Sequence, residues 1–346
     1  MEKIKIAVDA MGGDLAPAAV VEGAVGAVKE DPDILVLLCG QEEAVRAELA
    51  KHSYPSEQIQ VVNCTEVIDM AEPPVQAIAK KKDSSIVRGM MLVRKGEAEA
   101  FVSAGSTGAV LVGGQVLVGR VKGVQRPPLG ALVPTQKGFS LLIDCGANMD
   151  ARPSWLLQFA EMGSIYVSHM LGIEKPRVGI VNVGAEEEKG NTLVKETFPL
   201  LSACEDLNFI GSVEARDIPS GAADVIVCDA FVGNVILKMY EGVAATLIGA
   251  IKGSLMSSVQ GKIGGLLVKK PMKGVLKTFD ASRYGGAPLL GLKGLVVKTH
   301  GSSKAVEIRN STLQCRDFSR LNISEEIRER MEAEAEMIRR LKKAEV

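Results

Sequence analysis

The chain is poor in the residues on which nucleic-acid-binding proteins depend. Aromatic side chains make up 4% of the 346 residues, and there is one tryptophan, so a platform that stacks the bases of a single strand is not expected. The formal net charge is −1, which gives no general attraction for a polyanion. These two shortages argue against a general nucleic-acid binder.

Cysteine and histidine are also scarce, and their spacing matches no common metal motif. The six cysteines include no CxxC pair, and the three histidines are far apart in the sequence, so no zinc motif is predicted and no metal is assigned to the site. Cys39, Cys145 and Cys228 lie in or beside apolar runs, where buried, reduced thiols are expected. This cysteine usage fits a reducing compartment and predicts a cytoplasmic protein.

Long apolar runs are absent as well. No run of 18 or more consecutive apolar residues occurs, so no membrane-spanning helix is predicted. The first strand-like segment begins at Ile4, which leaves no room for a signal peptide before it.

What the chain does contain is a series of short Val- and Ile-rich runs that alternate with helix-length segments. The strand-like runs are Ile4–Val8, Ile34–Cys39, Ile59–Val62, Ala100–Ser103, Ala131–Pro134, Ser140–Ile143, Arg177–Val183, Asn208–Gly211, Asp224–Cys228 and Leu295–Thr299. The helix-length segments include Ala16–Lys29, Glu42–Lys51, Ser84–Lys95, Thr107–Leu117, Pro153–Leu171, Thr192–Glu205 and Asn234–Ile251. This alternation predicts an α/β fold with a doubly wound, mainly parallel sheet. We expect residues 1–346 to form one α/β/α enzyme domain in two intimate lobes, with a hairpin inserted near Gly123–Gly138.

Residues 242–279 form a basic segment. It contains six lysines and no Asp or Glu, and Leu, Ile, Val and Met are interleaved with the lysines. One interpretation is a helical hairpin with a core face and a solvated basic face. The other is an amphipathic basic surface that meets an anionic lipid or an acidic partner protein. The sequence does not separate them.

Residues 324–346 are predicted to form a C-terminal helix. Ser324 can cap its start, and Glu325 and Glu326 suit the positive end of the helix dipole. We expect this helix to pack on its own subunit, with a role in a dimer as the alternative.

Five loops, each placed after a strand-like run, are rich in Gly, Asp and Asn. They are 9–14, 103–109, 144–148, 184–191 and 229–234. If the strands are parallel, all five lie along one edge of one sheet, where such proteins build their sites.

The loop of Ala104, Gly105, Ser106, Thr107 and Gly108 is the predicted phosphate-binding loop. Glycines let the backbone approach a ligand, and the N–H groups at the start of the following helix attract an anion. The alternative is an ordinary turn in which Ser or Thr caps the helix.

Two loops supply candidate catalytic side chains. Lys189 is predicted to lie near a helix N-terminus, where its ammonium can neutralise charge on a transferring group; alternatively it only balances the neighbouring glutamates. The amide of Asn234 can donate to an oxyanion, or Asn234 can serve as a helix N-cap.

The remaining candidates have less specific roles. Asp9, Gly12, Gly13, Asp144, Asn148 and His300 all belong to loops that follow strands. The carboxylates can orient loops, hold a water or bind a metal, although helix capping suits them at least as well. His300 is either a titrating or ligand-binding group or a hydrogen-bonded structural histidine.

The motifs together resemble the acyl-carrier-protein–phosphate acyltransferase family of bacterial phospholipid synthesis. They run in order through nearly the whole chain: Ala7–Asp14, Ser103–Ala109, Asp144–Asn148, Lys189–Asn191, Val213–Asp217, Gly233–Asn234, Tyr284–Ala287 and His300–Ser303. The resemblance implies a fold similar to isocitrate and isopropylmalate dehydrogenases and to phosphate acetyltransferase. It also implies a homodimer on the inner membrane surface that converts acyl-carrier protein thioester and inorganic phosphate into acyl phosphate. In that family the Lys of Lys-Gly-Asn and the Asn of Gly-Asn are held to be catalytic, which points to Lys189 and Asn234.

Four positions depart from the family pattern. Leu15 replaces a usual His, Ser106 a common Asn, Ala230 a common Gly, and Lys304 a usual Asp or Asn. The departure at Ser106 leaves the side-chain contacts to phosphate open, while the backbone of the loop is unaffected.

Other patterns are missing. No Ser-His-Asp or Cys-His arrangement stands out, and no Gly-x-Gly-x-x-Gly follows the first strand, so a classical dinucleotide fold is disfavoured and no cofactor is expected. The nearest alternative function is a phosphate acetyl- or butyryltransferase that uses acyl-coenzyme A. A nicotinamide-dependent dehydrogenase or a non-enzymatic membrane scaffold are more distant alternatives.

Overall fold

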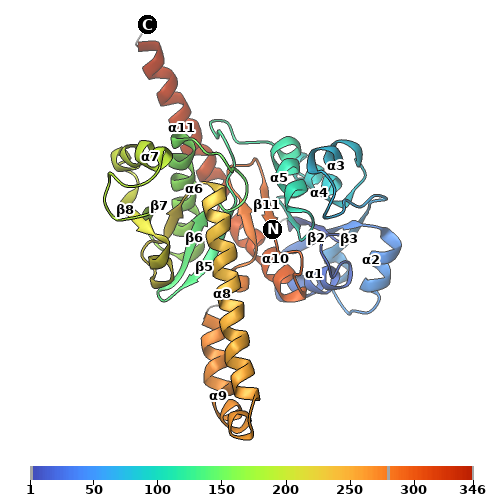
Figure 1. The fold of residues 1–346 in the computed structure, drawn as a ribbon. Helices are drawn as coiled ribbons and strands as arrows, with labels where there is room; N and C mark the ends of the chain where they lie inside the picture. Colours follow the sequence, from blue (N-terminus) through green and yellow to red (C-terminus); the bar gives the residue numbers. More distant parts are fainter. Residues whose placement is uncertain (1–2, 279–280, 345–346) are drawn as a thin grey trace. The chain divides into compact units, whose positions relative to one another are not determined.

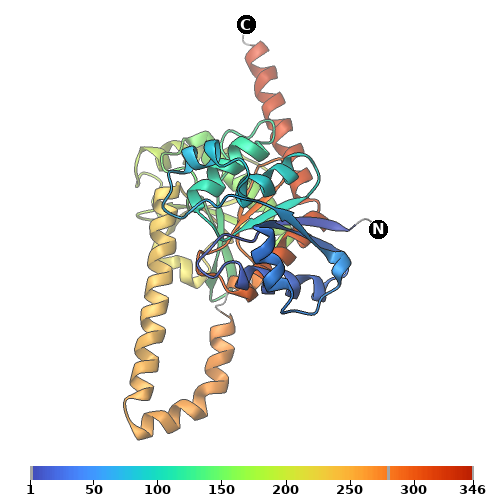
Figure 2. The same cartoon turned by 90° about the vertical axis from the view of Figure 1, so that its right-hand side faces the viewer.

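The strands form two sheets in the computed structural model, which describes residues 3–278 and 281–344. The chain divides into two compact units (Figures 1 and 2). Unit 1 consists of Met1–Ala131, Glu161–Lys175 and Ser282–Val346, and unit 2 consists of Leu132–Ala160 and Pro176–Ala281. The α/β class and the mainly parallel pairing are as predicted.

Unit 1 holds a six-stranded sheet in the order β10-β11-β4-β1-β2-β3. The strands are β1 (Ile4–Asp9), β2 (Ile34–Gly40), β3 (Ile59–Asn63), β4 (Ala100–Ser103), β10 (Ala287–Leu289) and β11 (Leu295–Lys298). All neighbouring pairs are parallel except β10 and β11. Every residue of β2 and β4 is buried, as expected for apolar strands covered on both faces.

The helices of unit 1 come from all three of its chain segments. They are α1 (Ala18–Glu30), α2 (Glu42–Leu49), α3 (Pro74–Lys80), α4 (Ser85–Arg94), α5 (Thr107–Gly113), a π-helical turn (Gly114–Val118), α10 (Ala305–Arg320) and α11 (Ile323–Ala344). Helix α6 (Pro153–Leu171) contributes residues to both units. The sequence analysis singled out neither α3 nor α10, and α10 is polar in its average composition.

Unit 2 holds a five-stranded sheet in the order β5-β6-β9-β7-β8. Its strands are β5 (Gly130–Thr135), β6 (Gly138–Ile143), β7 (Arg177–Asn182), β8 (Asn208–Glu214) and β9 (Val225–Val227). The β6–β9, β9–β7 and β7–β8 pairs are parallel. Helix α7 (Thr192–Ala203) packs against β7 and β8.

The expectation that all five Gly-, Asp- and Asn-rich loops share one edge of one sheet was wrong. The loops after β1 and β4 belong to the sheet of unit 1, and those after β6, β7 and β9 belong to the sheet of unit 2. The proline-rich stretch within 123–138 separates the two sets in the sequence. A periodic pattern identifies strands but does not say which strands pair, so the sequence did not reveal the second sheet.

Residues 242–278 continue as two helices that extend beyond the rest of unit 2 (Figures 1 and 2). Helix α8 (Ala230–Met256) is followed by α9 (Val259–Thr278), and the two helices contact each other. The predicted helical hairpin is present, but the core face proposed for it is not, because Leu247, Leu266 and Leu267 are between 59% and 78% exposed. Residue 279, the end of the predicted segment, lies outside the described residues.

Helix α8 also has a property that the sequence analysis did not expect. Within the described ranges it is the one helix that is long and apolar enough to cross a membrane, judged by length and composition alone. The finding is weak evidence of a span, and the first turn of α8 is anchored in unit 2 through buried Ala230 and Gly233.

The C-terminal helix α11 begins one residue before the predicted cap, Ser324. Ile323, Ile327 and Met331 are buried, and the guanidinium of Arg330 donates to the buried carboxylate of Glu161 over 2.8 Å. The first half of α11 therefore packs on its own chain. Residues 345 and 346 lie outside the described part.

Candidate functional site

Three loops meet at the carboxyl edge of the sheet in unit 1. They follow β1, β4 and β11, which are adjacent strands. The Asp14 N–H donates to the Gly301 carbonyl over 2.8 Å, and Gly13 has a φ of +99°. A Cβ on Gly13 would lie 2.9 Å from both the Ala104 Cβ and the Gly301 oxygen, so glycine is needed here for its conformation and for its size.

Asp9 is buried beneath these loops. Its carboxylate accepts the Ser103 hydroxyl over 2.6 Å and the Met11 N–H over 3.2 Å. Burial raises the pKa of Asp9, and hydrogen bonds from Ser103 and Ser85 counter that rise. Asp9 therefore orients the loops, which was one of the roles predicted for it.

In the predicted phosphate loop, several groups already have partners. The Gly105 N–H donates to the Ser103 hydroxyl over 3.0 Å, so this amide is not free for a ligand. Ser106 is the N-cap of α5, because its hydroxyl accepts the Ala109 N–H over 3.4 Å. Within residues 3–278 and 281–344, no hydrogen bond uses the N–H groups of Ser106, Thr107 or Gly108. The turn is thus both a helix cap and a set of three available donors, while the Gly105 N–H is used within the loop itself.

His300 stabilises its own turn. The side chain is exposed, and its Nδ1 lies 3.2 Å from the Ser302 N–H and 2.8 Å from the Ser302 hydroxyl. This arrangement fits the structural alternative given for this histidine.

A second group of loops meets at the carboxyl edge of the sheet in unit 2, after the adjacent strands β6, β9 and β7. The buried carboxylate of Asp144 accepts the N–H groups of Gly146 and Ala147 over 3.0 Å each. It also accepts the Asn148 N–H over 2.8 Å and the Asn148 amide over 2.7 Å. Asp144 and Asn148 therefore shape this loop from within.

The same loop fixes the start of α8. The Asn148 carbonyl accepts the Ala230 N–H over 2.9 Å, and a Cβ on Gly233 would overlap the carbonyl of Asp144. This close packing explains why Gly233 precedes Asn234.

Asn234 is not a helix N-cap, which corrects that alternative. The cap of α8 is Asp229, whose carboxylate accepts the Val232 N–H over 3.0 Å. Asn234 lies four residues after the first helical residue, Ala230, and is partly exposed. No hydrogen bond of its side chain occurs in the described part of the chain, so its amide is available as a donor.

Lys189 forms an ion pair with Glu186. Its Nζ lies 2.8 Å from the Glu186 carboxylate, and both side chains are about half exposed, at 50% and 52%. The hydrogen bond and charge of Glu186 raise the pKa of Lys189. An exposed pair of this kind is weak, so a phosphate dianion can compete for the ammonium.

The backbone of the Lys189 loop is anchored by Asn182, a residue that the sequence analysis did not single out. The Asn182 amide donates to the Lys189 carbonyl over 3.2 Å and to the Ser212 hydroxyl over 3.0 Å. Gly190, at a φ of +104°, completes the turn. The available signal was a polar residue directly after the apolar stretch 178–181 of β7.

The thiols near these loops are unsuited to nucleophilic attack. Cys145 and Cys228 are buried, and burial raises the pKa of both thiols. The described residues contain no group of three or more His, Cys, Asp or Glu side chains arranged to hold a metal.

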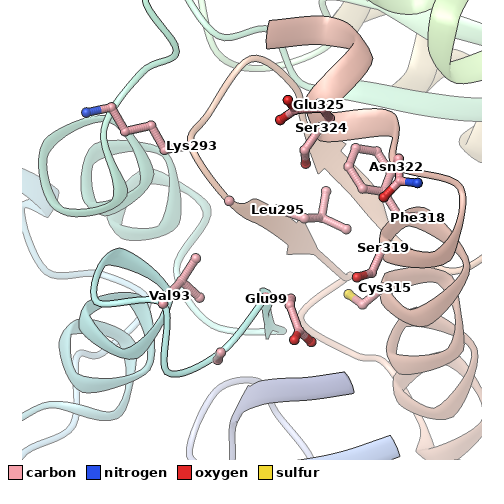
Figure 3. Close-up of a pocket in the computed structure, with 13 residues that line it drawn as sticks. Val93, Glu99, Lys293, Leu295, Cys315, Phe318, Ser319, Asn322, Ser324 and Glu325 are labelled. Carbon is pink, nitrogen blue, oxygen red and sulfur yellow. The ribbon is translucent and has the colours of Figure 1, made fainter. Parts of the chain in front are cut away.

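A pocket of about 310 Å³ lies elsewhere in unit 1 (Figure 3). It is lined by Ala98 and Glu99, just before β4, and by Lys293 and Gly294, just before β11. It therefore lies at the amino edge of the sheet, opposite the Gly-rich loops, and is not part of the candidate site.

Comparison with known proteins gives a consistent result. The model of a family described as "Fatty acid synthesis protein" matches residues 4–326. The chain is 46% identical over 332 residues to a phosphate acyltransferase of Clostridium beijerinckii, covering 96% of this chain and 100% of that protein. It is 48% identical over 322 residues to a phosphate acyltransferase of Clostridium botulinum strain Loch Maree, covering 93% and 96%.

Solved structures share the fold at low sequence identity. A phosphotransacetylase from Streptococcus pyogenes has a TM-score of 0.59 and 18% identity, covering 92% of this chain and 94% of that one. A branched-chain phosphotransacylase from Enterococcus faecalis has a TM-score of 0.53 and 15% identity, covering 91% and 98%. At this identity the likeness concerns the fold.

Proposed function

The chain belongs to the fatty acid synthesis protein family, and on this basis we propose that it transfers a fatty acyl group from acyl-carrier protein to inorganic phosphate. It is an enzyme, a phosphate acyltransferase. Two relatives with that name match 96% and 93% of this chain. The product is an acyl phosphate, which serves phospholipid synthesis.

The reaction needs alignment and charge stabilisation more than a strong base. A phosphate oxygen attacks the thioester carbonyl carbon, a C–O bond forms, and the carbonyl oxygen becomes an oxyanion. The oxyanion then collapses, the C–S bond breaks, and the carrier leaves as a thiolate that takes up a proton from solvent. A thiol has a pKa of about 8.5, so the thiolate is a good leaving group. The two main tasks are holding the phosphate and stabilising the oxyanion.

The observation that carries the assignment of roles is the set of donors without partners. We assign the N–H groups of Ser106, Thr107 and Gly108 to phosphate, because no hydrogen bond in the described part of the chain uses them. Ala104 and Gly105 shape the loop. We assign the amide of Asn234 to the oxyanion, because it neither caps α8 nor bonds another side chain.

Lys189 supplies the positive charge. Its ammonium leaves Glu186 to neutralise charge on the phosphate and on the tetrahedral intermediate. The loop that carries it is held by Asn182, so the backbone stays in place while the side chain moves.

Two partners follow from this function. The acyl donor is an acidic carrier protein, and the basic segment 242–278 has six lysines and no acidic residue to attract it. The same segment carries exposed Leu266 and Leu267 beside Lys269 and Lys270. This mixture suits an anionic membrane surface, so we place the enzyme in the cytoplasm, peripherally bound to the inner face of the membrane. The homodimer is proposed separately, because the family resemblance implies it.

The decisive experiment supplies palmitoyl carrier protein and inorganic phosphate to the purified chain and measures acyl phosphate. Formation of acyl phosphate that depends on both substrates supports the proposal. A parallel reaction with palmitoyl- and acetyl-coenzyme A tests the alternative. Faster turnover of a coenzyme A thioester than of the carrier thioester would make the chain a coenzyme A-dependent transferase instead.

A further inference from the structure

Three polar side chains stand in a row at the carboxyl ends of adjacent strands. Asp9 ends β1, Ser103 ends β4 and Lys298 ends β11. Lys298 is in register with Ser103, and Asp9 lies one residue beyond the Val8–Val102 pair. Residues in register on neighbouring strands project from the same face of a sheet. Asp9, Ser103 and Lys298 therefore occupy neighbouring positions on one face of the sheet.

Asp9, Ser103 and Lys298 are buried, and the hydrogen bonds of Ser103 link Asp9 to Gly105. Asp9 and Ser103 are each 1% exposed and Lys298 is 7% exposed. The Ser103 hydroxyl donates to Asp9 over 2.6 Å and accepts the Gly105 N–H over 3.0 Å. Because its proton is held by Asp9, the lone pairs of the Ser103 oxygen are left for Gly105. The carboxylate thereby fixes the hydroxyl, and the hydroxyl fixes the start of the phosphate loop.

The same carboxylate controls the neighbouring loop. It accepts the Met11 N–H over 3.2 Å, and a Cβ on Gly12 would overlap the Asp9 carboxylate. A Cβ on Gly105 would lie 3.1 Å from Asp9 Oδ2 and 3.2 Å from Ser103 Oγ. Both loops thus rest on Asp9 and Ser103 with no spare room.

Lys298 has a smaller influence on Asp9 than the hydrogen bonds from Ser103, Ser85 and Met11. An isolated buried carboxylate is costly, and a nearby cation offsets part of that cost. The ammonium of Lys298 lowers the pKa of Asp9, opposing the larger effect of burial. It also donates to the carbonyl of Thr299, which ties it to the third loop of this edge.

We propose that Asp9 and Ser103 are positioning residues that hold the phosphate loop in its binding conformation through the amide of Gly105. The proposal rests on the proposed function, since it takes 104–108 as the phosphate site. It adds one residue, Ser103, that acts on phosphate through the loop without touching it.

The test compares Ser103→Ala with Ser140→Ala. Ser140 is a matched control, because it is also a buried strand serine and its hydroxyl donates to the Ala223 carbonyl over 2.6 Å. Initial rates are measured against inorganic phosphate and, separately, against palmitoyl carrier protein. We expect Ser103→Ala to raise the KM for phosphate about tenfold with little change in the KM for the carrier thioester, because the loop loses its anchor. Ser140→Ala should change neither KM.

Two further variants test the order of the contacts. Asp9→Ala should raise the KM for phosphate by a similar factor, and the double variant with Ser103→Ala should be little worse than either single one, since the residues act in series. Ser103→Thr keeps the hydroxyl and should retain most of the phosphate affinity. Together with Asp9→Ala, it tests the proposal if Ser103→Ala does not fold.

The outcomes separate this proposal from the proposed function. A wild-type chain that forms no acyl phosphate defeats the proposed function. An active wild type, with a folded Ser103→Ala variant whose KM for phosphate is unchanged or rises no more than its KM for the carrier, defeats the positioning role alone. Fully additive effects of Asp9→Ala and Ser103→Ala would also overturn it.

Discussion

At the scale of single residues, the candidate side chains fall into two groups. The side-chain oxygen atoms of Asp9, Asp144 and Ser106 accept hydrogen bonds from nearby backbone N–H groups. These residues therefore stabilise the loops. Asn234 and Lys189 differ from them. The side chain of Asn234 has no hydrogen-bond partner among the described residues. Lys189 pairs with the exposed Glu186, a partner that a ligand can replace. The second group is the one that can meet a substrate.

The amide of Asn234 gives the first prediction. Asn234→Ala should lower kcat by about a hundredfold or more, the usual cost of losing one oxyanion donor. Asn234→Asp should be at least as damaging, because a carboxylate cannot donate and adds negative charge. Steady-state kinetics measure both variants, and thermal melting checks that they fold. Near-normal turnover in a folded Asn234→Ala variant would remove this assignment.

The ion pair of Lys189 gives the second. Lys189→Met should raise the KM for phosphate and lower kcat, and Lys189→Arg should recover part of both because it keeps the charge. Glu186→Gln should lower the KM for phosphate, since the ammonium no longer has to leave a carboxylate. The pKa of Lys189 is raised above 10.5, so the ammonium stays charged near neutral pH. A loss of activity between about pH 6 and 9 that disappears in Lys189→Arg would contradict this.

The loops that follow the strands could be located from the sequence, whereas several residues that hold these loops could not. Loops rich in Gly, Asp and Asn stand out in a sequence, whereas Ser103, Asn182 and Lys298 are isolated polar residues at the ends of strands. Their role depends on which strands are neighbours, and the sequence does not state this. Asn234 was a candidate cap because it precedes an apolar run, but Asp229 competes for the same role and begins the helix earlier.

At the scale of elements, the strands were predictable because each is a short apolar run with its own boundaries. Helix α10 was not, since its polar composition hides the face that packs against α1. Part of what holds α10 is ionic. Arg316 donates to the Asp31 carboxylate over 3.0 Å, and Arg320 lies 3.1 Å from it.

Asp31 gives the third prediction. Burial opposes ionisation of Asp31, but the Asp33 N–H and the guanidinium of Arg316 lower its pKa below 3.8 overall. A lowered folded pKa means that the stabilisation is present above about pH 4 and is lost as the pH falls through the folded value. Asp31→Asn should therefore lower the free energy of unfolding at pH 7. The difference in this free energy between the variant and the wild type should become smaller below pH 4. Urea unfolding at several pH values measures this difference.

The control for this prediction is Asp33→Asn. Asp33 pairs with Arg320 over 2.6 Å, but its side chain is 50% exposed, so the change should be small at every pH. If the two substitutions lowered the free energy of unfolding equally, the role given to Asp31 would be ruled out. A difference between Asp31→Asn and wild type that grows at acid pH would also rule it out.

The hairpin of α8 and α9 gives the fourth prediction. Changing Lys269, Lys270 and Lys273 to Glu should abolish flotation with anionic vesicles, because charge attraction becomes repulsion. Flotation of wild type should also fall as salt is added. Turnover of carrier thioester in solution, measured alongside, shows whether the same lysines receive the carrier protein.

A matched variant carries the same change in charge on unit 1. Lys51, Lys80 and Lys95 are exposed lysines outside the hairpin, and their change to Glu should leave flotation intact. Equal loss of flotation in both triple variants would mean that net charge, and not the hairpin, governs binding.

At the scale of the whole molecule, charge is unevenly divided. The chain has a net charge of −1 and residues 242–279 contribute +6, so the remaining residues together carry −7. A composition average conceals this separation. The sequence pattern revealed the basic segment, but only the structure shows that its apolar side chains lack a core to pack in.

The fifth prediction concerns assembly. We expect light scattering after size exclusion to give about twice the mass of the 36.7 kDa chain, in keeping with the proposed homodimer. Exposed Phe231, Val235 and Met239 on α8 are apolar surface that a partner can cover. A mass equal to one chain across a range of concentrations would exclude the dimer.

Unit 1 is built from three separate segments of the chain, which affects how the nascent chain can fold. Its sheet needs β11 beside β4, yet nearly two hundred residues separate the two strands along the chain. Most of unit 2 emerges from the ribosome as an uninterrupted stretch and can fold while translation continues. Strand β11 is made only near the end of synthesis, so a nascent chain that stalls late in the hairpin contains Lys189 and Asn234 but lacks the strand that pairs with β4, which leads into the phosphate loop.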